Sequence, residues 1–407
     1  MDLNNLLHYV CLRTPAGVEK HFLEFANEIA VRYPAWTQTV LATGGSIHPH
    51  IRQELNRRIA TVHEKYAGSV KLPKHPRVLR RWRNCLLLKR LEPELVVVWN
   101  RPSRAGELLR VLGGRRWLYW EHGAAWHSDY EEARRAFYRA APFVIANSHA
   151  ALRMMQLKWQ IEAPAEVCLN ALRPSLKPQS ADGKTCSEQR RFRLGAVSRL
   201  IPLKGGPLVL HALKQITDGG LDAELHIAGA GYLRKALEDL AGHLGVAERV
   251  IWHGLVQDMS GFYQTIDCLL HPALHEPFGL VAIEAAAHGC PVIAAAVDGL
   301  PEAVRDGETG YCIQPDLPLS AYDRYGGSAT GVPKTVYDPA TDTLIEPRFV
   351  EPGEIAQRVL DLVSDPVRYQ DLSRSAIAGI DRYYDFTAHT RKVADIFAGI
   401  TAGPACE

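Results

Sequence analysis

The chain has 407 residues, of which 47% are hydrophobic and 23% are charged, the balance of an ordinary globular protein. Its length predicts two domains or three, and its composition excludes a disordered tail protein, a collagen-like chain and a small disulfide scaffold. No run of about 18 apolar residues predicts a membrane span. Segment 1–13 lacks the basic and apolar regions of a secretory signal, so we expect a cytoplasmic protein.

The formal net charge of +2 conceals two halves of opposite sign. Residues 1–190 contain 29 Lys and Arg against 17 Asp and Glu, a net charge of +12. The remainder contains 18 against 28, a net charge of −10. Such an asymmetry indicates two domains that meet different partners.

Basic residues concentrate in segment 71–90, which holds eight Lys and Arg and no acidic residue. Trp82 and Leu86–Leu88 stand among these charges. Two interpretations remain open: a solvated helix face, or a surface that meets anionic lipid or a phosphorylated acceptor. We expect no nucleic-acid partner, because no recognised nucleic-acid-binding motif accompanies the charges.

The eight cysteines form no Cys-x-x-Cys pair and no Cys/His cluster with the spacing of metal ligands. We therefore expect buried, reduced thiols rather than disulfides or a metal site. Four of them lie in short apolar runs that predict strands: Cys11, Cys168, Cys268 and Cys312.

Short apolar runs alternate with helix-period segments, which is typical of βαβ units around parallel sheets. Between the first two runs, segment 16–33 places Val18, Phe22, Phe25 and Ile29 at helical spacing. In the first half the predicted strands are 7–12, 39–43, 95–100, 117–122, 143–147 and 166–170. In the second half they are 193–200, 223–231, 249–256, 267–273, 290–297 and 310–315.

Two stretches interrupt this alternation. Segment 176–190 is rich in Pro, Ser, Lys and Gly and predicts an interdomain linker. Segment 316–350 contains Pro, Asp, Tyr and Gly clusters and predicts a long loop or small excursion. We therefore predict an α/β fold of two doubly wound domains, 1–175 and 191–380, that face each other across a cleft, with ligands beyond the carboxyl ends of the strands.

The segment HPALHEPFGLVAIEAAAHGCPVIAAAVDGLPE (271–302) has the strongest chemical pattern. A predicted strand runs into a loop, and Phe278–Leu280 open an apolar helix whose first amides suit a phosphate. Gly279 permits close backbone approach. Glu276 lies before the helix and Glu284 inside its apolar run, where an unpaired carboxylate is costly. One interpretation is that Glu276 is an ordinary loop residue and Glu284 an ordinary surface residue. The pattern favours the other interpretation, in which both belong to a binding site.

The stretch HEPFGLVAIEAAAHGCPVIA resembles the donor-binding segment of the retaining glycosyltransferases of family 4, which have the GT-B fold. That family's motif is Glu, seven residues, Glu, as Glu276 and Glu284 stand here. The resemblance implies that Glu276 approaches the hydroxyls of the donor sugar and that Glu284 binds the ribose of the nucleotide. It also implies that the backbone of Phe278, Gly279 and Leu280 cradles the diphosphate.

Upstream, GAVSRLIPLKGG (195–206) resembles the same family's S-R-L-x-x-x-K-G segment. Arg199 and Lys204 end a predicted strand and precede a helix, so both can reach a ligand beyond the strand end. Two cations at a leaving diphosphate stabilise the transition state more than the ground state. Two turns, IAGAGY (227–232) and WHGLVQDM (252–259), resemble nucleotide-side turns of the family but are equally read as tight turns.

In the first half, LRTPAGVEKHFLEFA (12–26) resembles the Gly-rich turn that follows the family's first strand. Ala16 replaces its first glycine, whereas Gly17 remains and is assigned to the donor phosphates by the resemblance. His122 stands just past a predicted strand and resembles the family's active-site histidine, whose backbone or ring contacts the donor sugar. The C-terminal helix, 381–407, resembles the GT-B tail that crosses back onto the first domain.

The resemblance implies an enzyme that moves a hexose-type sugar, with retention, from a nucleoside diphosphate (UDP- or GDP-linked) to a hydroxyl of a glycan or glycolipid. The predicted catalytic residues are His122, Arg199, Lys204 and Glu276. With no Asp-x-Asp motif in the sequence, we expect neither a required metal nor a cofactor. The basic half suits an enzyme of surface-polysaccharide or lipopolysaccharide assembly at the inner face of the cytoplasmic membrane, touching anionic lipid through 71–90.

Two alternatives remain. A GT-B sugar-nucleotide 2-epimerase would turn over its substrate without an acceptor. A non-catalytic sugar-nucleotide-binding partner would bind the donor and show no turnover. The presence of Arg199, Lys204, Glu276 and Glu284 favours the transferase.

Overall fold

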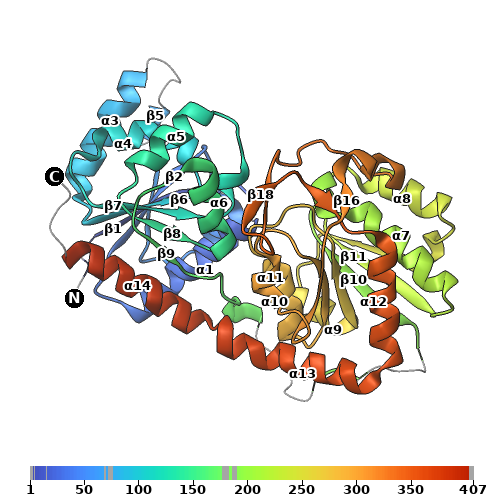
Figure 1. The fold of residues 1–407 in the computed structure, drawn as a ribbon. Helices are drawn as coiled ribbons and strands as arrows, with labels where there is room; N and C mark the ends of the chain where they lie inside the picture. Colours follow the sequence, from blue (N-terminus) through green and yellow to red (C-terminus); the bar gives the residue numbers. More distant parts are fainter. Residues whose placement is uncertain are drawn as a thin grey trace. The chain divides into compact units, whose positions relative to one another are not determined.

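The computed structural model describes residues 3, 5–14, 16–67, 70–71, 77–176, 183–185 and 190–402. The chain folds into two compact units, each built on its own parallel sheet (Figure 1). Unit 1 comprises Met1–Asn147, Met155–Leu169 and Phe386–Glu407, and unit 2 comprises Ser148–Met154 and Asn170–Asp385.

The sheet of unit 1 is seven-stranded and parallel throughout. Its first strand is central, and the chain moves outward first to one side and then to the other, the order of a doubly wound fold. In sheet order the strands are β3 (Ala60–His63), β2 (Gln38–Thr43), β1 (Leu6–Cys11), β6 (Leu95–Trp99), β7 (Trp117–Glu121), β8 (Val144–Ala146) and β9 (Ala165–Val167).

Helices cover this sheet, and the last helix of the chain is one of them. Helix α14 (Phe386–Ala402) packs against α1 (Gly17–Arg32) (Figure 1). The rings of Phe25 and Phe397 meet edge to face there, with their centroids 6.1 Å apart. The other helices of unit 1 among the described residues are α2 (Pro49–Glu54), α3 (Arg77–Leu91), α4 (Gly106–Leu112) and α5 (Glu131–Ala140), and β4 (Tyr66–Ala67) pairs antiparallel with β5 (Val70–Lys71). Helix α6 (His149–Trp159) begins in unit 2 and ends in unit 1.

Unit 2 has a six-stranded parallel sheet with the same winding. In sheet order its strands are β12 (Val250–Gly254), β11 (Ala223–Ala228), β10 (Phe192–Val197), β13 (Cys268–His271), β14 (Val292–Ala295) and β15 (Gly310–Ile313). Its helices are α7 (Gly206–Asp218), α8 (Arg234–His243), α9 (Met259–Thr265), α10 (Leu280–Ala287), α11 (Leu300–Ala303), α12 (Pro352–Ser364) and α13 (Pro366–Tyr383).

The apolar runs form strands because both faces of a parallel sheet are covered, so a central strand can bury side chains on both of its faces. All residues of β1, β2 and β6 are buried in this way. Each predicted strand overlaps an observed one, which confirms the prediction of two parallel-sheet α/β domains. The edge strand β3 was not predicted, because its residues are half-buried or exposed and present no apolar run.

The unit boundaries differ from the predicted ones at 175 and 380. Segment 170–176 belongs to unit 2, where the amide of Leu172 donates to the carbonyl of Tyr384 at 2.9 Å. Part of the predicted linker is described, and it is fixed to unit 2. Lys184 Nζ donates to the carbonyls of Tyr263 and Gln264 at 2.7 and 3.1 Å, and its amide donates to Ser373 Oγ at 2.7 Å. The rest of the linker, 177–182 and 186–189, lies outside the described residues.

The predicted excursion, 316–350, contains short elements rather than a bare loop. A 3₁₀ helix at Leu319–Tyr325 follows β16 (Leu317–Pro318), which pairs with β19 (Arg348–Phe349). A second hairpin joins β17 (Val336–Asp338) to β18 (Thr343–Ile345). The buried Tyr322 hydroxyl donates to the carbonyl of Pro202 at 3.0 Å, so the excursion is packed against the loop that follows β10.

All six cysteines among the described residues are free thiols; Cys186 and Cys406 lie outside that part of the chain. Within the described ranges, no helix combines the length and the apolar character that crossing a bilayer requires.

Candidate active site

Strands β10 and β13 lie side by side where the order of the unit 2 sheet reverses. In doubly wound sheets the chain departs to opposite faces at this point, which leaves room for a ligand beyond the carboxyl ends. Lys204 lies in the loop after β10, His271 ends β13, and Glu276 lies in the loop after it. The sequence had suggested Lys204 and Glu276 from separate motifs, and the fold brings them together.

These three side chains form one charged cluster. Lys204 Nζ lies 2.6 Å from Glu276 Oε2, and His271 Nε2 lies 3.2 Å from the same oxygen. Burial by itself would raise the pKa of the Glu276 carboxyl, but Lys204 and His271 outweigh that effect and hold it well below its usual range. Glu276 is therefore a carboxylate at neutral pH, and Lys204 carries the charge that balances it.

Close backbone packing fixes the distance between Lys204 and Glu276. Gly205 has a φ of +70°, and a Cβ there would lie 2.2 Å from the carbonyl oxygen of Pro272. Only glycine permits this contact. The amide of Leu274 also donates to the carbonyl of Leu203 at 2.9 Å, so a backbone hydrogen bond joins the loops after β10 and β13.

Asp298, in the loop after β14, supports the glutamate from the other side. Its Oδ2 accepts hydrogen bonds from His275 Nδ1 at 2.6 Å and from the amide of Glu276 at 3.2 Å. Its Oδ1 accepts from the amide of Tyr337 in the excursion at 2.7 Å. Asp298 has a φ of +50°, which is a strained backbone conformation for a residue other than glycine. The hydrogen bonds of its side chain stabilise this conformation. The excursion thus braces both loops of the cluster.

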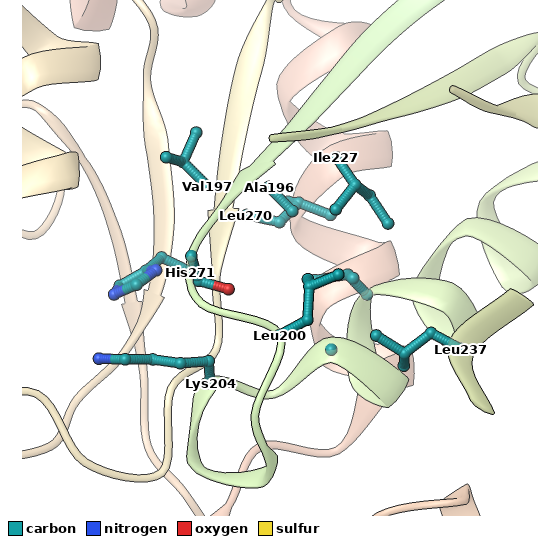
Figure 2. Close-up of a pocket in the computed structure, with 11 residues that line it drawn as sticks. Ala196, Val197, Leu200, Lys204, Ile227, Leu237, Leu270 and His271 are labelled. Carbon is teal, nitrogen blue, oxygen red and sulfur yellow. The ribbon is translucent and has the colours of Figure 1, made fainter. Parts of the chain in front are cut away.

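A pocket lies beside the cluster (Figure 2). Its apolar side is formed by Leu200, Ile227 and Leu237, whereas the side chains of Lys204 and His271 extend together to the opposite side. An apolar wall next to a few convergent polar groups is typical of a ligand site.

Phe278, Gly279 and Leu280 lie at the start of α10, where the sequence had predicted a helix to begin, and the Phe278 side chain has a structural role. The ring of Phe278 is buried, 6.0 Å from that of Tyr384. Gly279 has a φ of +110°, and a Cβ there would lie 2.8 Å from Leu300 Cδ2. The amides of Leu280 and Val281, in the first turn of α10, donate to no oxygen of the described residues, so they remain available to an anion.

Glu284 belongs to a second cluster. Its Oε1 accepts from Arg173 Nη2 at 2.8 Å and its Oε2 from the Tyr263 hydroxyl at 2.9 Å. It shares no hydrogen bond with Glu276 or Lys204 among the described residues. The sequence carried no signal for Arg173 or Tyr263, whereas His271 could have been found as a polar residue ending a strand five positions before Glu276.

Arg199 is exposed in the loop after β10 and makes no ion pair with a described residue. It is not part of the Lys204–Glu276 cluster.

Two predicted residues lie in unit 1. Gly17 is exposed as the first residue of α1, whose N-cap Ala16 offers no side-chain hydrogen bond. His122 was expected to contact a sugar through its backbone or its ring, and the structure shows the ring buried. It stacks on Trp99 at 5.3 Å and 6°, and lies 5.5 Å from the ring of His21. Burial and nearby His389 lower the pKa of His122 to about 3, so the ring is a neutral part of the unit 1 core.

The described residues hold no group of three or more His, Cys, Asp or Glu side chains placed to bind a metal ion.

Comparison with known proteins finds a family match over the segment that contains the cluster. Residues 182–323 match the family model of glycosyl transferases group 1. The D-inositol 3-phosphate glycosyltransferase of Streptomyces griseus is 32% identical over 220 residues, 49% of this chain and 44% of that protein. The match thus spans less than half the length of that relative.

Solved structures match the whole chain. HepE of Anabaena, in complex with UDP, has a TM-score of 0.73 at 18% identity, covering 97% of this chain and 100% of HepE. WaaG, a glycosyltransferase involved in lipopolysaccharide biosynthesis, has a TM-score of 0.66 at 18% identity, covering 98% of this chain and 100% of WaaG. At these identities the likeness shows the fold, which is GT-B with two Rossmann-like domains.

Proposed function

We propose that the protein is a retaining glycosyltransferase that moves a hexose-type sugar from a nucleoside diphosphate to a hydroxyl of a glycan or glycolipid. The observation that carries the proposal is the Lys204–Glu276–His271 cluster at the switch point of unit 2, inside the glycosyl transferases group 1 domain. Lys204 is positioned to receive the charge that develops on a leaving diphosphate, and Glu276 to accept hydrogen bonds from sugar hydroxyls.

The first turn of α10 supports the same assignment. The free amides of Leu280 and Val281 are neutral donors at a helix N-terminus, which suits the diphosphate. Lys204, and Arg199 if its exposed side chain turns inward, would supply cations. The proposal therefore assigns the phosphate charge to protein groups and includes no metal. UDP is the first nucleotide to try, because HepE was solved with it.

Calorimetric titration of the chain with UDP, GDP and ADP in a metal-free buffer tests the proposal. We expect one of the three to bind at least tenfold tighter than the others. Failure of all three to bind would reject it. Turnover of the matching sugar nucleotide with no acceptor would instead favour an epimerase. Binding of the nucleotide without turnover, even when acceptor mixtures are present, would favour a non-catalytic partner.

We also propose that the acceptor is presented at an anionic membrane, as in lipopolysaccharide or surface-polysaccharide assembly. The support lies on α3 in unit 1. Val78, Leu79, Trp82 and Leu86 are 68, 39, 61 and 45% exposed. At about 100° per residue they fall on one face of the helix, opposite buried Leu88. Exposed Arg81, Lys89 and Arg90 accompany them. An apolar face with basic residues suits the surface of an anionic bilayer.

The predicted membrane segment began at residue 71, but 72–76 lie outside the described residues, so the proposal rests on α3 alone. Sedimentation with vesicles of phosphatidylglycerol and phosphatidylcholine tests it. We expect the double variant Trp82→Ser/Leu86→Ser to sediment several-fold less than wild type and to bind nucleotide unchanged. Val367→Ser, which removes an equally exposed residue of unit 2, is the control. Equal sedimentation of all three proteins would contradict membrane contact through α3.

A further inference from the structure

The carboxylate of Glu284 is held by two side chains that come from distant parts of unit 2. Arg173 Nη2 donates to Oε1 at 2.8 Å, and the Tyr263 hydroxyl donates to Oε2 at 2.9 Å. Arg173 lies just before a 3₁₀ turn at Pro174–Leu176, and Tyr263 lies on α9. Each oxygen of the glutamate therefore already has one donor.

The surroundings make a lone charge at Glu284 costly. Its helix neighbours Ile283, Ala285 and Ala286 are buried, and the side chains of Glu284 and Arg173 are 8 and 12% exposed. A carboxylate in such a place needs a cation and hydrogen-bond donors to stay ionised and oriented. Burial and the charge of Glu284 raise the pKa of Tyr263 well above its usual range, so its hydroxyl remains a donor.

Arg173 is itself anchored independently of α10. The amide of neighbouring Leu172 donates to the carbonyl of Tyr384 at 2.9 Å, and the Tyr384 hydroxyl is hydrogen-bonded to the carbonyl of Glu302 at 2.5 Å. Both contacts lie within unit 2. The guanidinium thus approaches Glu284 from a fixed backbone, which lets it determine where the carboxylate points.

We propose that Arg173 is a positioning residue that holds Glu284 as a carboxylate aimed at the vicinal hydroxyls of the nucleotide's ribose. The inference rests on the proposed function, in which unit 2 binds a nucleoside diphosphate. A carboxylate offers about four acceptor positions, and Arg173 and Tyr263 occupy two of them. The two that remain match the two donors of a ribose diol. Recognition of ribose over deoxyribose is then a property of the Arg173–Glu284 pair and not of Glu284 alone.

The test compares the affinity for a ribonucleotide with that for its deoxy counterpart, a ratio that loss of overall stability does not change. The probes are UDP, GDP or ADP, whichever binds tightest, and the same nucleotide lacking the 2′-hydroxyl. We expect wild type to prefer the ribonucleotide by about 10- to 100-fold, the usual worth of a hydrogen bond to a charged group. In Arg173→Gln the ratio should fall below about threefold.

Arg190→Gln is the matched control. Arg190 donates to Asp267 through both terminal nitrogens, at 2.7 and 2.6 Å. The two residues form an arginine–carboxylate pair in the same unit that has no assigned role in binding. It should keep the wild-type ratio. An unchanged ratio in Arg173→Gln, or a wild type that does not prefer the ribonucleotide, would overturn the inference.

Arg173→Lys keeps the proposal testable if Arg173→Gln does not fold. Lysine retains the charge but not the planar fork, so the ratio should fall only in part, and an unchanged ratio again overturns the inference. Failure of the proposed function looks different: the wild type would then bind no nucleoside diphosphate at all.

Discussion

The sheets of units 1 and 2 have the same winding, but the residues that follow their strands differ. In unit 2 the switch point carries Lys204, Glu276 and His271, a charged cluster beside a pocket. In unit 1 the residue after β7, His122, turns into a core of aromatic rings and is neutral. The comparison teaches that, within one kind of fold, the neighbouring side chains decide whether the residues after a strand form a site or part of the core.

The largest effect is expected from removing the cation of the unit 2 cluster. Lys204→Ala leaves Glu276 without its balancing charge and the leaving diphosphate without a donor. We expect kcat/KM for donor turnover to fall about 10²- to 10³-fold, the usual loss for one preorganised electrostatic group. Lys214→Ala, which breaks an exposed pair with Asp218 on α7, should keep wild-type turnover. A Lys204→Ala enzyme with near wild-type kcat/KM would remove the cluster from the chemistry.

His122→Ala should instead act on stability. The ring fills space between Trp99, Trp120 and His21, so its loss leaves a cavity and should lower the free energy of unfolding by about 2–4 kcal/mol. Nucleotide binding, measured by calorimetry below the melting temperature, should not change. A stable variant that loses donor affinity would support the sugar contact that the family resemblance implies for His122.

Acid should weaken unit 1. Burial lowers the pKa of His8 and His389 to about 4 and of His122 to about 3, below the unfolded value near 6.5. The unfolded chain therefore binds protons first, and stability present above pH 6.5 is lost as the pH falls toward 4, at up to about 1.4 kcal/mol per pH unit for each histidine.

Urea unfolding of wild type and His389→Leu at pH 7.5 and pH 5 measures this loss. The variant should lose less stability between the two values, whereas His243→Gln, which changes an exposed residue of α8, should behave as wild type. Equal losses in wild type and His389→Leu would show that the buried histidine does not govern the acid response.

The smallest effect is expected from removing divalent metal ions, which should leave turnover unchanged. Because the proposal assigns the diphosphate charge to Lys204 and the amides of α10, turnover should be the same with EDTA as with added Mg²⁺. An activity that disappears with EDTA and returns with Mg²⁺ would require a metal at the diphosphate.

The fold and two of the three cluster residues could be predicted from the sequence for a physical reason. Strands buried on both faces leave continuous apolar runs, and motif spacing marks Lys204 and Glu276 within two short segments. Their pairing could not be foreseen, because it depends on β10 and β13 being neighbours in the sheet. The same holds for Asp298, whose bonds reach His275 and Tyr337 from a turn that gives no pattern of its own.

His122 shows what a local sequence motif does not reveal, namely the surroundings of a side chain. Its position just after a strand was predicted, whereas the direction of its ring leaves no pattern in the sequence. His21 lies on α1 and His389 on α14, far away in the sequence, and together with Trp99 they surround the ring. A local motif cannot report a burial that is made by segments so distant from it.

A crystal structure of the chain with the tightest-binding nucleoside diphosphate tests the central claim most directly. The account predicts diphosphate oxygens within hydrogen-bond distance of Lys204 Nζ and of the amide of Leu280. A nucleotide bound elsewhere, with Lys204 still paired only with Glu276, would contradict it.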